Sequence, residues 1–278
     1  MVSTPARTML FVPADRPDRY AKAAESDADA IIIDLEDAVA PKTKAAARKM
    51  LCVPHALPQG IDIFVRLNGR STPWYDADVA AVSLLPVAGV ILPKTETVTD
   101  ITALASRFGD RVIIALIETA RGLSAAREIA RAPSTTRLAF GSIDFCADIG
   151  AAHTRDALLA ARSEIVLASR LAGIAPPLDG VTTSLDDAAL IENDARHASE
   201  LGFGGKLCIH PRQIAPVWRG FLPSTEEIAW ARRVLDAEGQ GAASVDGAMV
   251  DAPVRARART IIARASAATS SHDRGTMP

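Results

Sequence analysis

Short apolar runs alternate with helix-forming segments along most of this 278-residue chain, and this alternation limits the possible folds more than any other feature. Continuous apolar runs are typical of strands in a parallel sheet that is covered on both faces. Such runs occupy residues 8–13, 30–36, 62–68, 89–94, 112–118, 137–144, 179–183 and 206–210. Strand–helix units repeated in this way predict an α/β fold, a (β/α)8 TIM barrel, over residues 1–222.

A doubly wound open sheet is the alternative fold for the same pattern. Such a sheet normally carries a Gly-rich phosphate-binding turn after its first strand. Here the first apolar run leads into Val12-Pro13-Ala14-Asp15, which is not a turn of that kind. The segments between the runs have helical spacing, over residues 16–26, 43–51, 98–108, 122–132, 161–173 and 186–202. The barrel is therefore the predicted fold.

The barrel pattern ends near residue 220, and residues 223–278 are predicted to form a separate extension, a small C-terminal helical lid. Ser224 begins a helical pattern, and Glu227 is placed to complete a capping box with it. Residues 239–254 are Gly-rich and turn-forming. We expect roughly the last ten residues to be disordered.

The composition excludes several classes of partner. The net charge is −2 and the aromatic content is 4%, so neither nucleic acid nor an anionic membrane is an expected partner. Three cysteines without CxxC spacing indicate a reducing compartment. The amino terminus lacks the apolar core of a secretory signal, and the apolar runs are too short to cross a bilayer. We expect a soluble, cytoplasmic protein.

Two acidic residues, Glu118 and Asp144, end apolar runs that lie about one strand–helix unit apart. In a barrel this spacing places both carboxylates at the carboxyl ends of neighbouring strands, where active sites lie. Two carboxylates in one pocket repel each other unless a cation lies between them. The pair therefore predicts a divalent metal site.

Further charged residues are expected at the same end of the barrel. Glu36 and Asp37 follow the second apolar run, Arg66 lies near the end of the third, and Lys94 ends the fourth. A solvated strand end explains any one of these residues, but it does not explain why they share one end. Arg66 and Lys94 supply counter-charge for an anionic substrate, because Arg can hold a carboxylate with two parallel hydrogen bonds.

Eight short segments carry a resemblance to a known family. They are RTMLFVP (7–13), IIIDLEDAV (31–39), VRLN (65–68), ILPKTE (91–96), IETARGL (117–123), FGSIDF (140–145), GKLCIHPRQI (205–214) and DGAMVDAPV (246–254). In these segments the chain resembles the citrate lyase beta-subunit family, within the larger superfamily of 2-oxoacid aldolases and malyl-CoA lyases. The resemblance covers about residues 7–265.

The resemblance implies roles for the strand-end residues. It implies that Glu118 and Asp144 are the two protein ligands of Mg²⁺, with water and substrate oxygens completing the octahedron. It implies that Asp37, with Glu36 in a shared role, bonds to water held by the metal. Arg66 matches the residue that binds the carboxylate or keto oxygen of a 2-oxoacid.

Asp251 matches a catalytic acid that the lid delivers to the active site of a neighbouring subunit. The resemblance therefore implies a homo-oligomer, a trimer or a hexamer. Arg7, Arg16 and Lys22 lie where contacts to CoA phosphates are expected, although a solvated helix face explains Arg16 and Lys22 equally well. His210, in the family's IHP motif, is as consistent with a structural role as with a chemical one.

One departure separates the branches of the superfamily. Aldolases that act on free acids carry a His directly after the Asp-x-Glu of the second strand, where this chain has Asp37. We therefore expect a Mg²⁺-dependent lyase that cleaves a 3-hydroxyacyl-CoA of the citryl, malyl or citramalyl type. Its products are a 2-oxoacid and an acyl-CoA, formed by retro-Claisen chemistry. A 2-oxoacid aldolase or acyl-CoA thioesterase on the same site and a non-catalytic binding subunit of a lyase complex are the alternatives.

Overall fold

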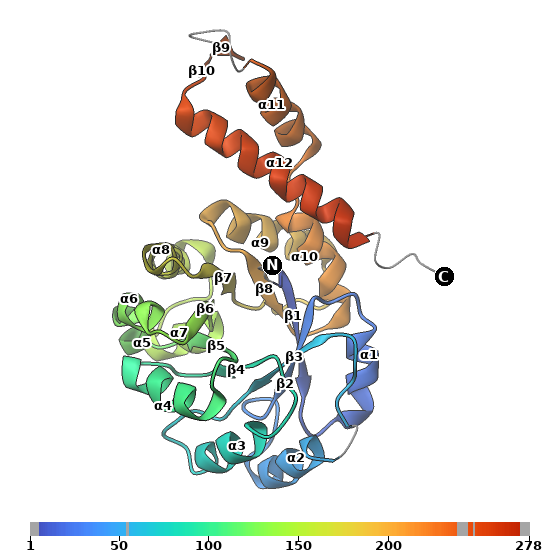
Figure 1. Cartoon of the computed structure of the whole chain (residues 1–278), viewed down its shortest axis with the longest axis vertical. Helices are drawn as coiled ribbons and strands as arrows, with labels where there is room; N and C mark the ends of the chain where they lie inside the picture. Colours follow the sequence, from blue (N-terminus) through green and yellow to red (C-terminus); the bar gives the residue numbers. More distant parts are fainter. Residues whose placement is uncertain (1–5, 54–55, 238–243, 247, 273–278) are drawn as a thin grey trace. The chain divides into compact units, whose positions relative to one another are not determined.

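Eight parallel strands pair in sequence order, and the first strand also pairs with the last to close the sheet into a barrel (Figure 1). The strands are β1 (Thr8–Pro13), β2 (Ala30–Asp34), β3 (Asp62–Arg66), β4 (Gly89–Leu92), β5 (Val112–Ile117), β6 (Thr135–Phe140), β7 (Ala175–Asp179) and β8 (Gly205–Cys208). The predicted (β/α)8 TIM barrel is confirmed.

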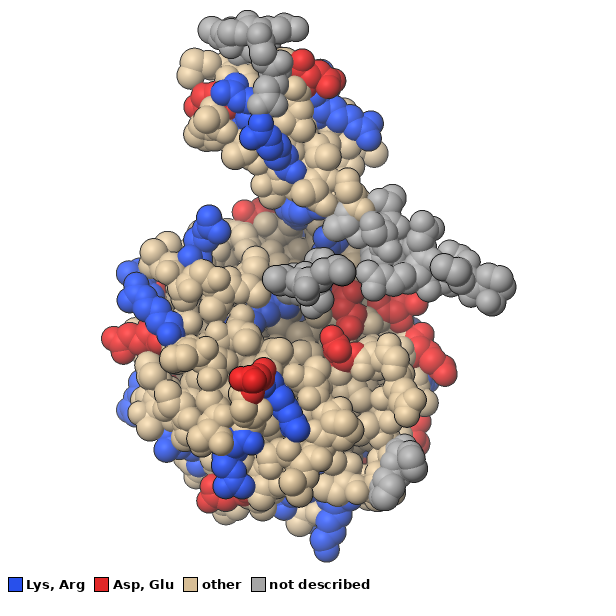
Figure 2. Space-filling view, viewed as in Figure 1, with Lys and Arg blue, Asp and Glu red and all other residues tan. Residues whose placement is uncertain are grey.

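This computed structural model describes residues 6–53, 56–237, 244–246 and 248–272. The chain divides into two compact units, Met1–Arg219 and Gly220–Pro278. None of the helices in the described ranges is long and apolar enough to span a membrane. Figure 2 shows that basic and acidic side chains both lie on the visible face of the barrel.

Helices follow the strands around the barrel, as the helical spacing predicts. They are α1 (Tyr20–Ala24), α2 (Lys44–Leu51), α3 (Tyr75–Val82), α4 (Val98–Phe108), α5 (Ala120–Ser124), α6 (Ala126–Arg131), α7 (Ser142–Ile149), α8 (Arg155–Ala172), α9 (Ala188–Leu201) and α10 (Ile214–Phe221). Three short 3₁₀ helices begin with proline, η1 (Pro17–Arg19), η2 (Pro41–Thr43) and η3 (Pro211–Gln213).

One strand lies earlier in the chain than predicted. The seventh strand is Ala175–Asp179 rather than residues 179–183, and it contains Pro176 and Pro177. Proline cannot donate a hydrogen bond to a neighbouring strand, so a proline pair argues against a strand in the sequence. The barrel tolerates the pair because the pairing of β7 with β6 is irregular, with a shift in register.

Alternate strand residues fill the interior of the barrel. The buried interior cluster is Met9, Ala30, Ile32, Phe64, Ile91, Ile114, Leu116, Ala139, Leu178 and Leu207. Side chains two residues apart on a strand point to the same face. Asp34, Arg66 and Glu118 come two residues after the interior side chains of β2, β3 and β5. The alternation therefore aims these three polar groups into the carboxyl-terminal mouth of the barrel.

The described residues of the second unit form two helices, α11 (Thr225–Asp236) and α12 (Ala252–His272), with a short hairpin of β9 (Ser244–Val245) and β10 (Ala248–Met249) between them in the chain. Its apolar core is Ala231, Val234, Val250, Ala258 and Ile261.

The start of α11 confirms the predicted capping box. The Ser224 hydroxyl accepts the backbone N–H of Glu227 at 3.1 Å, and the Glu227 carboxylate accepts the N–H of Ser224 at 2.9 Å. Helix α12 continues to His272, and residues 273–278 of the tail expected to be disordered lie outside the described residues.

We predict that Gly89→Ala destabilises the barrel. A methyl group at Gly89 would lie 2.3 Å from the carbonyl oxygen of Val112 and 2.9 Å from Cε1 of Phe64, so the backbone must shift. Overpacking of this kind costs about 1–3 kcal/mol, which lowers the melting temperature measured by circular dichroism. Gly69→Ala is the matched control, because its nearest neighbours would be 3.9 Å away. Equal melting temperatures for the two variants would contradict this packing argument.

Candidate active site

A buried ion pair joins the carboxyl ends of β2 and β3. Asp34 and Arg66 are directly paired in the strand register. Arg66 Nε donates to Asp34 Oδ1 at 2.8 Å, and Nη2 donates to Oδ2 at 2.6 Å. Burial opposes the charge on Arg66, but Asp34 acting together with Glu36 and Asp37 outweighs burial and raises the pKa of the arginine. The pair orients the guanidinium so that Nη1 is left for other partners.

Glu36 lies between the two cations of the site. Its Oε2 is 3.0 Å from Arg66 Nη1, a close ion-pair contact without an aligned N–H, and its Oε1 accepts from Lys94 Nζ at 2.8 Å. Burial raises the pKa of Glu36, and Arg66 opposes that effect. Asp37 is more exposed, and its Oδ2 lies 3.5 Å from Arg66 Nη1. Both predicted acids of this loop therefore contact the predicted arginine.

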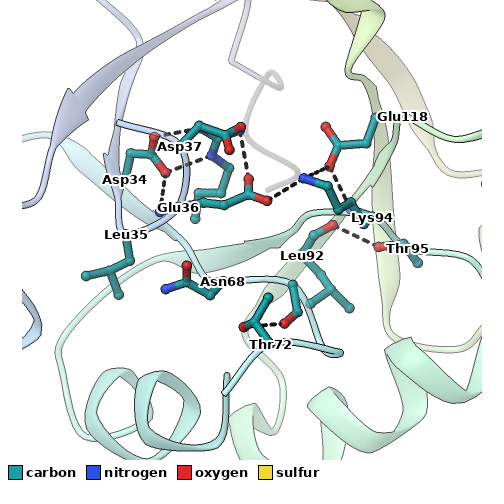
Figure 3. Close-up of polar contacts among 12 residues, drawn as sticks. Asp34, Leu35, Glu36, Asp37, Asn68, Thr72, Leu92, Lys94, Thr95 and Glu118 are labelled. Atoms are coloured by element: carbon teal, nitrogen blue, oxygen red, sulfur yellow. Dashed lines mark hydrogen bonds and ion pairs between the residues drawn. The ribbon is translucent and has the colours of Figure 1, made fainter. Parts of the chain in front are cut away.

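Lys94 connects Glu36 to Glu118 (Figure 3). Its ammonium is 3.7 Å from Glu118 Oε1, and its backbone N–H donates to the same oxygen at 2.8 Å. Lys94 has a φ of +48°, in the left-handed region that side chains other than glycine rarely adopt. Backbone strain of this kind is found at functional sites, where the surroundings hold it in place. Here this backbone conformation lets Lys94 direct its backbone N–H to Glu118 and its ammonium to Glu36.

Glu118 has an unsatisfied buried oxygen. No protein group among the described residues bonds to its Oε2. The carboxylate lies over Gly141, where a Cβ would approach Oε2 to 2.4 Å, so only glycine leaves it room. Burial, followed by the charge of Glu36, raises the pKa of Glu118 to about 8, and Asp144 adds to the effect.

Asp144 lies on a helix rather than at a strand end. The sixth strand ends at Phe140, and Asp144 is in the first turn of α7. The sequence prediction was wrong on this point because apolar residues continue from the strand into the helix. Asp144 is half-buried, and its charge acts on Glu118, so the fold does bring the two predicted ligands into one electrostatic neighbourhood.

The donor set suits a hard divalent cation. Glu118 Oε2 is buried and has no partner in the part of the chain that the structure describes, and the neighbouring acids repel one another. Mg²⁺ takes one or two protein carboxylates and retains several waters, so it does not need a larger cage of protein ligands. In the described parts of the chain, no cluster of three or more His, Cys, Asp or Glu is arranged to hold a metal. A two-carboxylate site that keeps waters agrees with both observations.

Arg7 lies at the opposite end of β1 from this cluster. It precedes Thr8 at the amino end of the strand, where its backbone N–H donates to Asp29 at 2.8 Å. Its guanidinium lies 4.8 Å from the Trp218 ring centroid. The structure therefore does not bring Arg7 to the mouth that holds Arg66 and Lys94, because a six-residue strand separates them.

Asp251 belongs to the second unit, where it caps a helix. Its Oδ1 accepts the backbone N–H of Val254 at 3.0 Å at the start of α12. This contact gives Asp251 a structural role in the unit. The catalytic role expected from the resemblance stays a prediction.

A cavity of about 520 Å³ opens at the carboxyl ends of β1 and β8. Arg19, Lys22 and His210 are among its lining residues. His210 also accepts the backbone N–H of Arg212 at 3.2 Å, which caps η3. Arg16, expected near CoA, pairs with Asp18, which also lines this cavity. Basic and apolar side chains therefore line the cavity together with Asp18.

Sequence reasoning missed the supports behind the site. No role is assigned to Asp34 from the sequence, yet Asp34 is the bidentate partner of Arg66. Asp78 is fully buried, and its Oδ2 accepts the backbone N–H of Asn68 at 3.0 Å and the side-chain amide at 2.6 Å. Asp78 is a charged residue on the otherwise apolar face of α3, and this position in the sequence was the available sign that it has a buried partner.

A closed β/α barrel with a network of acids and bases at the carboxyl ends of its strands defines the class as a barrel enzyme. Residues 7–211 match the family model for HpcH/HpaI aldolase/citrate lyase, and the chain belongs to this family.

Similar proteins extend over nearly the whole chain. A citrate lyase subunit beta-like protein of Mycobacterium tuberculosis is 40% identical, over 94% of this chain and 96% of the relative. A (3S)-malyl-CoA thioesterase of Cereibacter sphaeroides is 34% identical, over 95% of each. The crystal structure of M. tuberculosis CitE in complex with magnesium, acetoacetate and coenzyme A has a TM-score of 0.84 and 38% identity, and covers 94% of this chain and 98% of that one.

We predict that Glu118 makes the metal-free protein less stable as the pH rises. Its pKa in the folded protein, about 8, lies above the ordinary glutamate value. The contribution of the bound proton to stability is therefore complete below the ordinary pKa and is lost as the pH rises through about 8. Melting temperatures in EDTA should fall less for Glu118→Gln than for the wild type between about pH 5 and pH 9. The exposed Glu128→Gln is the control, and identical slopes for all three proteins would refute the assignment.

Proposed function

We propose that this protein is a Mg²⁺-dependent carbon–carbon lyase acting on a 3-hydroxyacyl-CoA. The observation that carries the proposal is the unsatisfied Glu118 Oε2, buried beside Asp144 and linked through Lys94 and Glu36 to Arg66. An acidic pocket that still contains an oriented arginine suits a metal ion together with an anionic substrate. Membership in a family of aldolases and lyases supports the same reaction type.

Two observations favour a thioester substrate. The cavity beside β1 and β8 combines Arg19 and Lys22 with apolar groups, and Arg16 pairs with Asp18, the acid that also lines it; this suits the phosphates and pantetheine arm of CoA. A similar crystal structure contains coenzyme A together with magnesium and acetoacetate. We therefore infer that a 2-oxoacid and an acyl-CoA are the products.

The residues of the site have different roles in the proposed reaction. Glu118 and Asp144 would hold Mg²⁺, with Asp37 and Glu36 bonding to its waters. Bound there, Mg²⁺ supplies Lewis-acid polarisation of the substrate oxygens. The Nη1 edge of Arg66 offsets the negative charge on the carboxylate and on the oxygen that becomes the keto group.

Bond cleavage balances without any further reactant. The substrate hydroxyl gives its proton to solvent water, its oxygen forms the new carbonyl, and the electron pair of the broken C–C bond passes to the thioester as an enolate, while the Asp251 carboxylate takes up one proton from solvent. We propose that Asp251 then protonates this enolate carbon to give the acyl-CoA. Lys94 keeps the acids of the pocket charge-balanced through its contacts with Glu36 and Glu118.

Thioester hydrolysis is the second candidate function. It is favoured by the 34% identity, over 95% of the chain, to a (3S)-malyl-CoA thioesterase. Hydrolysis consumes water and releases a free CoA thiol, whereas retro-Claisen cleavage releases an intact acyl-CoA. A thiol reagent therefore separates the two reactions in one assay.

The first activity prediction concerns substrate and metal. Malyl-, citramalyl- and citryl-CoA are incubated with the protein and Mg²⁺, and release of the 2-oxoacid and of free thiol is followed with and without EDTA. We expect metal-dependent oxoacid release without free thiol. Asp144→Asn should lose metal binding and activity together, because it removes a ligand charge. Thiol release alone would indicate a thioesterase, and no reaction with any thioester would indicate a binding subunit.

The second activity prediction concerns Asp251. Asn remains a good helix cap, so Asp251→Asn should leave the second unit folded while removing the acid. We expect turnover to fall by about 10²–10⁴-fold with unchanged metal affinity. If the lid serves a neighbouring subunit, mixing Asp144→Asn and Asp251→Asn proteins should restore part of the activity. Full activity of Asp251→Asn would remove this residue from the mechanism.

A further inference from the structure

Lys44 is buried beneath the loop that follows β2. It begins α2, and its ammonium donates to the carbonyl oxygens of Leu35 at 2.8 Å and Glu36 at 2.7 Å. The centroid of the Trp74 ring lies 5.1 Å from the same nitrogen. Both acceptors are neutral, and burial lowers the lysine pKa against the pull of Asp34 and other nearby acids. Burying an ammonium costs free energy of folding, so an uncharged donor would stabilise a purely structural contact at a lower cost.

The loop itself is held from two sides. Asp34 Oδ1 accepts the backbone N–H of Glu36 at 2.8 Å, and Oδ2 accepts the N–H of Ala38 at 3.1 Å. Lys44 binds the carbonyls on the other side of the same turn. The backbone of Glu36 is therefore fixed through both its donor and its acceptor, and the side chain starts from one defined position.

The position of Glu36 decides where the ammonium of Lys94 lies. Lys94 Nζ is 2.8 Å from Glu36 Oε1 but 3.7 Å from Glu118 Oε1. If Glu36 moved away, the ammonium would lose its nearer partner and turn to Glu118. It would then compete with a metal ion for that carboxylate.

We propose that Lys44 is a positioning residue, which fixes the Leu35–Glu36 backbone so that Glu36 holds Lys94 away from Glu118. Its consequence for catalysis rests on the proposed function, but its consequence for metal binding can be measured without turnover.

The test compares Lys44→Met with Lys49→Met, an exposed lysine on the same helix. The dissociation constant of Mn²⁺ is measured by electron paramagnetic resonance without substrate, beside the melting temperature. We expect folded Lys44→Met to bind Mn²⁺ about tenfold more weakly, and Lys49→Met to bind it like the wild type. With thioester substrate, kcat should fall while KM stays unchanged. Folded Lys44→Met with wild-type Mn²⁺ affinity would overturn the proposal.

A double-mutant cycle distinguishes positioning from a general structural role. Because Lys44 acts through Glu36, Lys44→Met should weaken Mn²⁺ binding by less than about twofold in a Glu36→Gln background. If Lys44→Met weakens Mn²⁺ binding by the same factor in the Glu36→Gln background as in the wild type, the proposal is overturned. If Lys44→Met does not fold, Lys44→Gln carries the same tests, because its amide nitrogen is one bond short of the position of Nζ and does not reproduce both contacts. A wild type that binds Mn²⁺ but cleaves no thioester would refute the proposed function alone.

Discussion

The bidentate ion pair between Asp34 and Arg66 is the interaction on which the rest of the site depends. It joins two neighbouring strand ends and uses one edge of the guanidinium, so the other edge faces Glu36. Glu36 in turn holds Lys94, whose ammonium and backbone N–H both lie at Glu118. Positive and negative groups therefore alternate across the mouth of the barrel, and each group is held in place by contact with the group before it in this series.

This alternation ends with a charge that the protein does not satisfy. Glu118 has one oxygen bound to Lys94 and one buried oxygen that has no hydrogen-bond partner among the described residues, and Asp144 adds a second acid nearby. Removing such a carboxylate from water is costly unless a proton or a cation joins it. The raised pKa of Glu118 and the proposed affinity for Mg²⁺ have the same physical origin, because proton and metal compete for one oxygen.

The sequence predicted the barrel and its charged mouth because both follow from local patterns. Apolar runs define the strands, and alternation places Arg66 and Glu118 inward. Prediction from the sequence failed where tertiary packing determines the local structure. An example is β7, because its two prolines argue against a strand. The sequence also could not show that Lys44 reaches back to two carbonyls, because pairing between distant residues has no periodic signature.

The central claim is that Glu118 and Asp144 together hold a divalent cation. The most direct measurement is anomalous diffraction from crystals grown with Mn²⁺, which locates the ion without any assumption about turnover. A single anomalous peak within bonding distance of both carboxylates, with the ammonium of Lys94 still on Glu36, is the result that this account predicts. A peak bound elsewhere, or Lys94 bound to Glu118 in place of the ion, would contradict it.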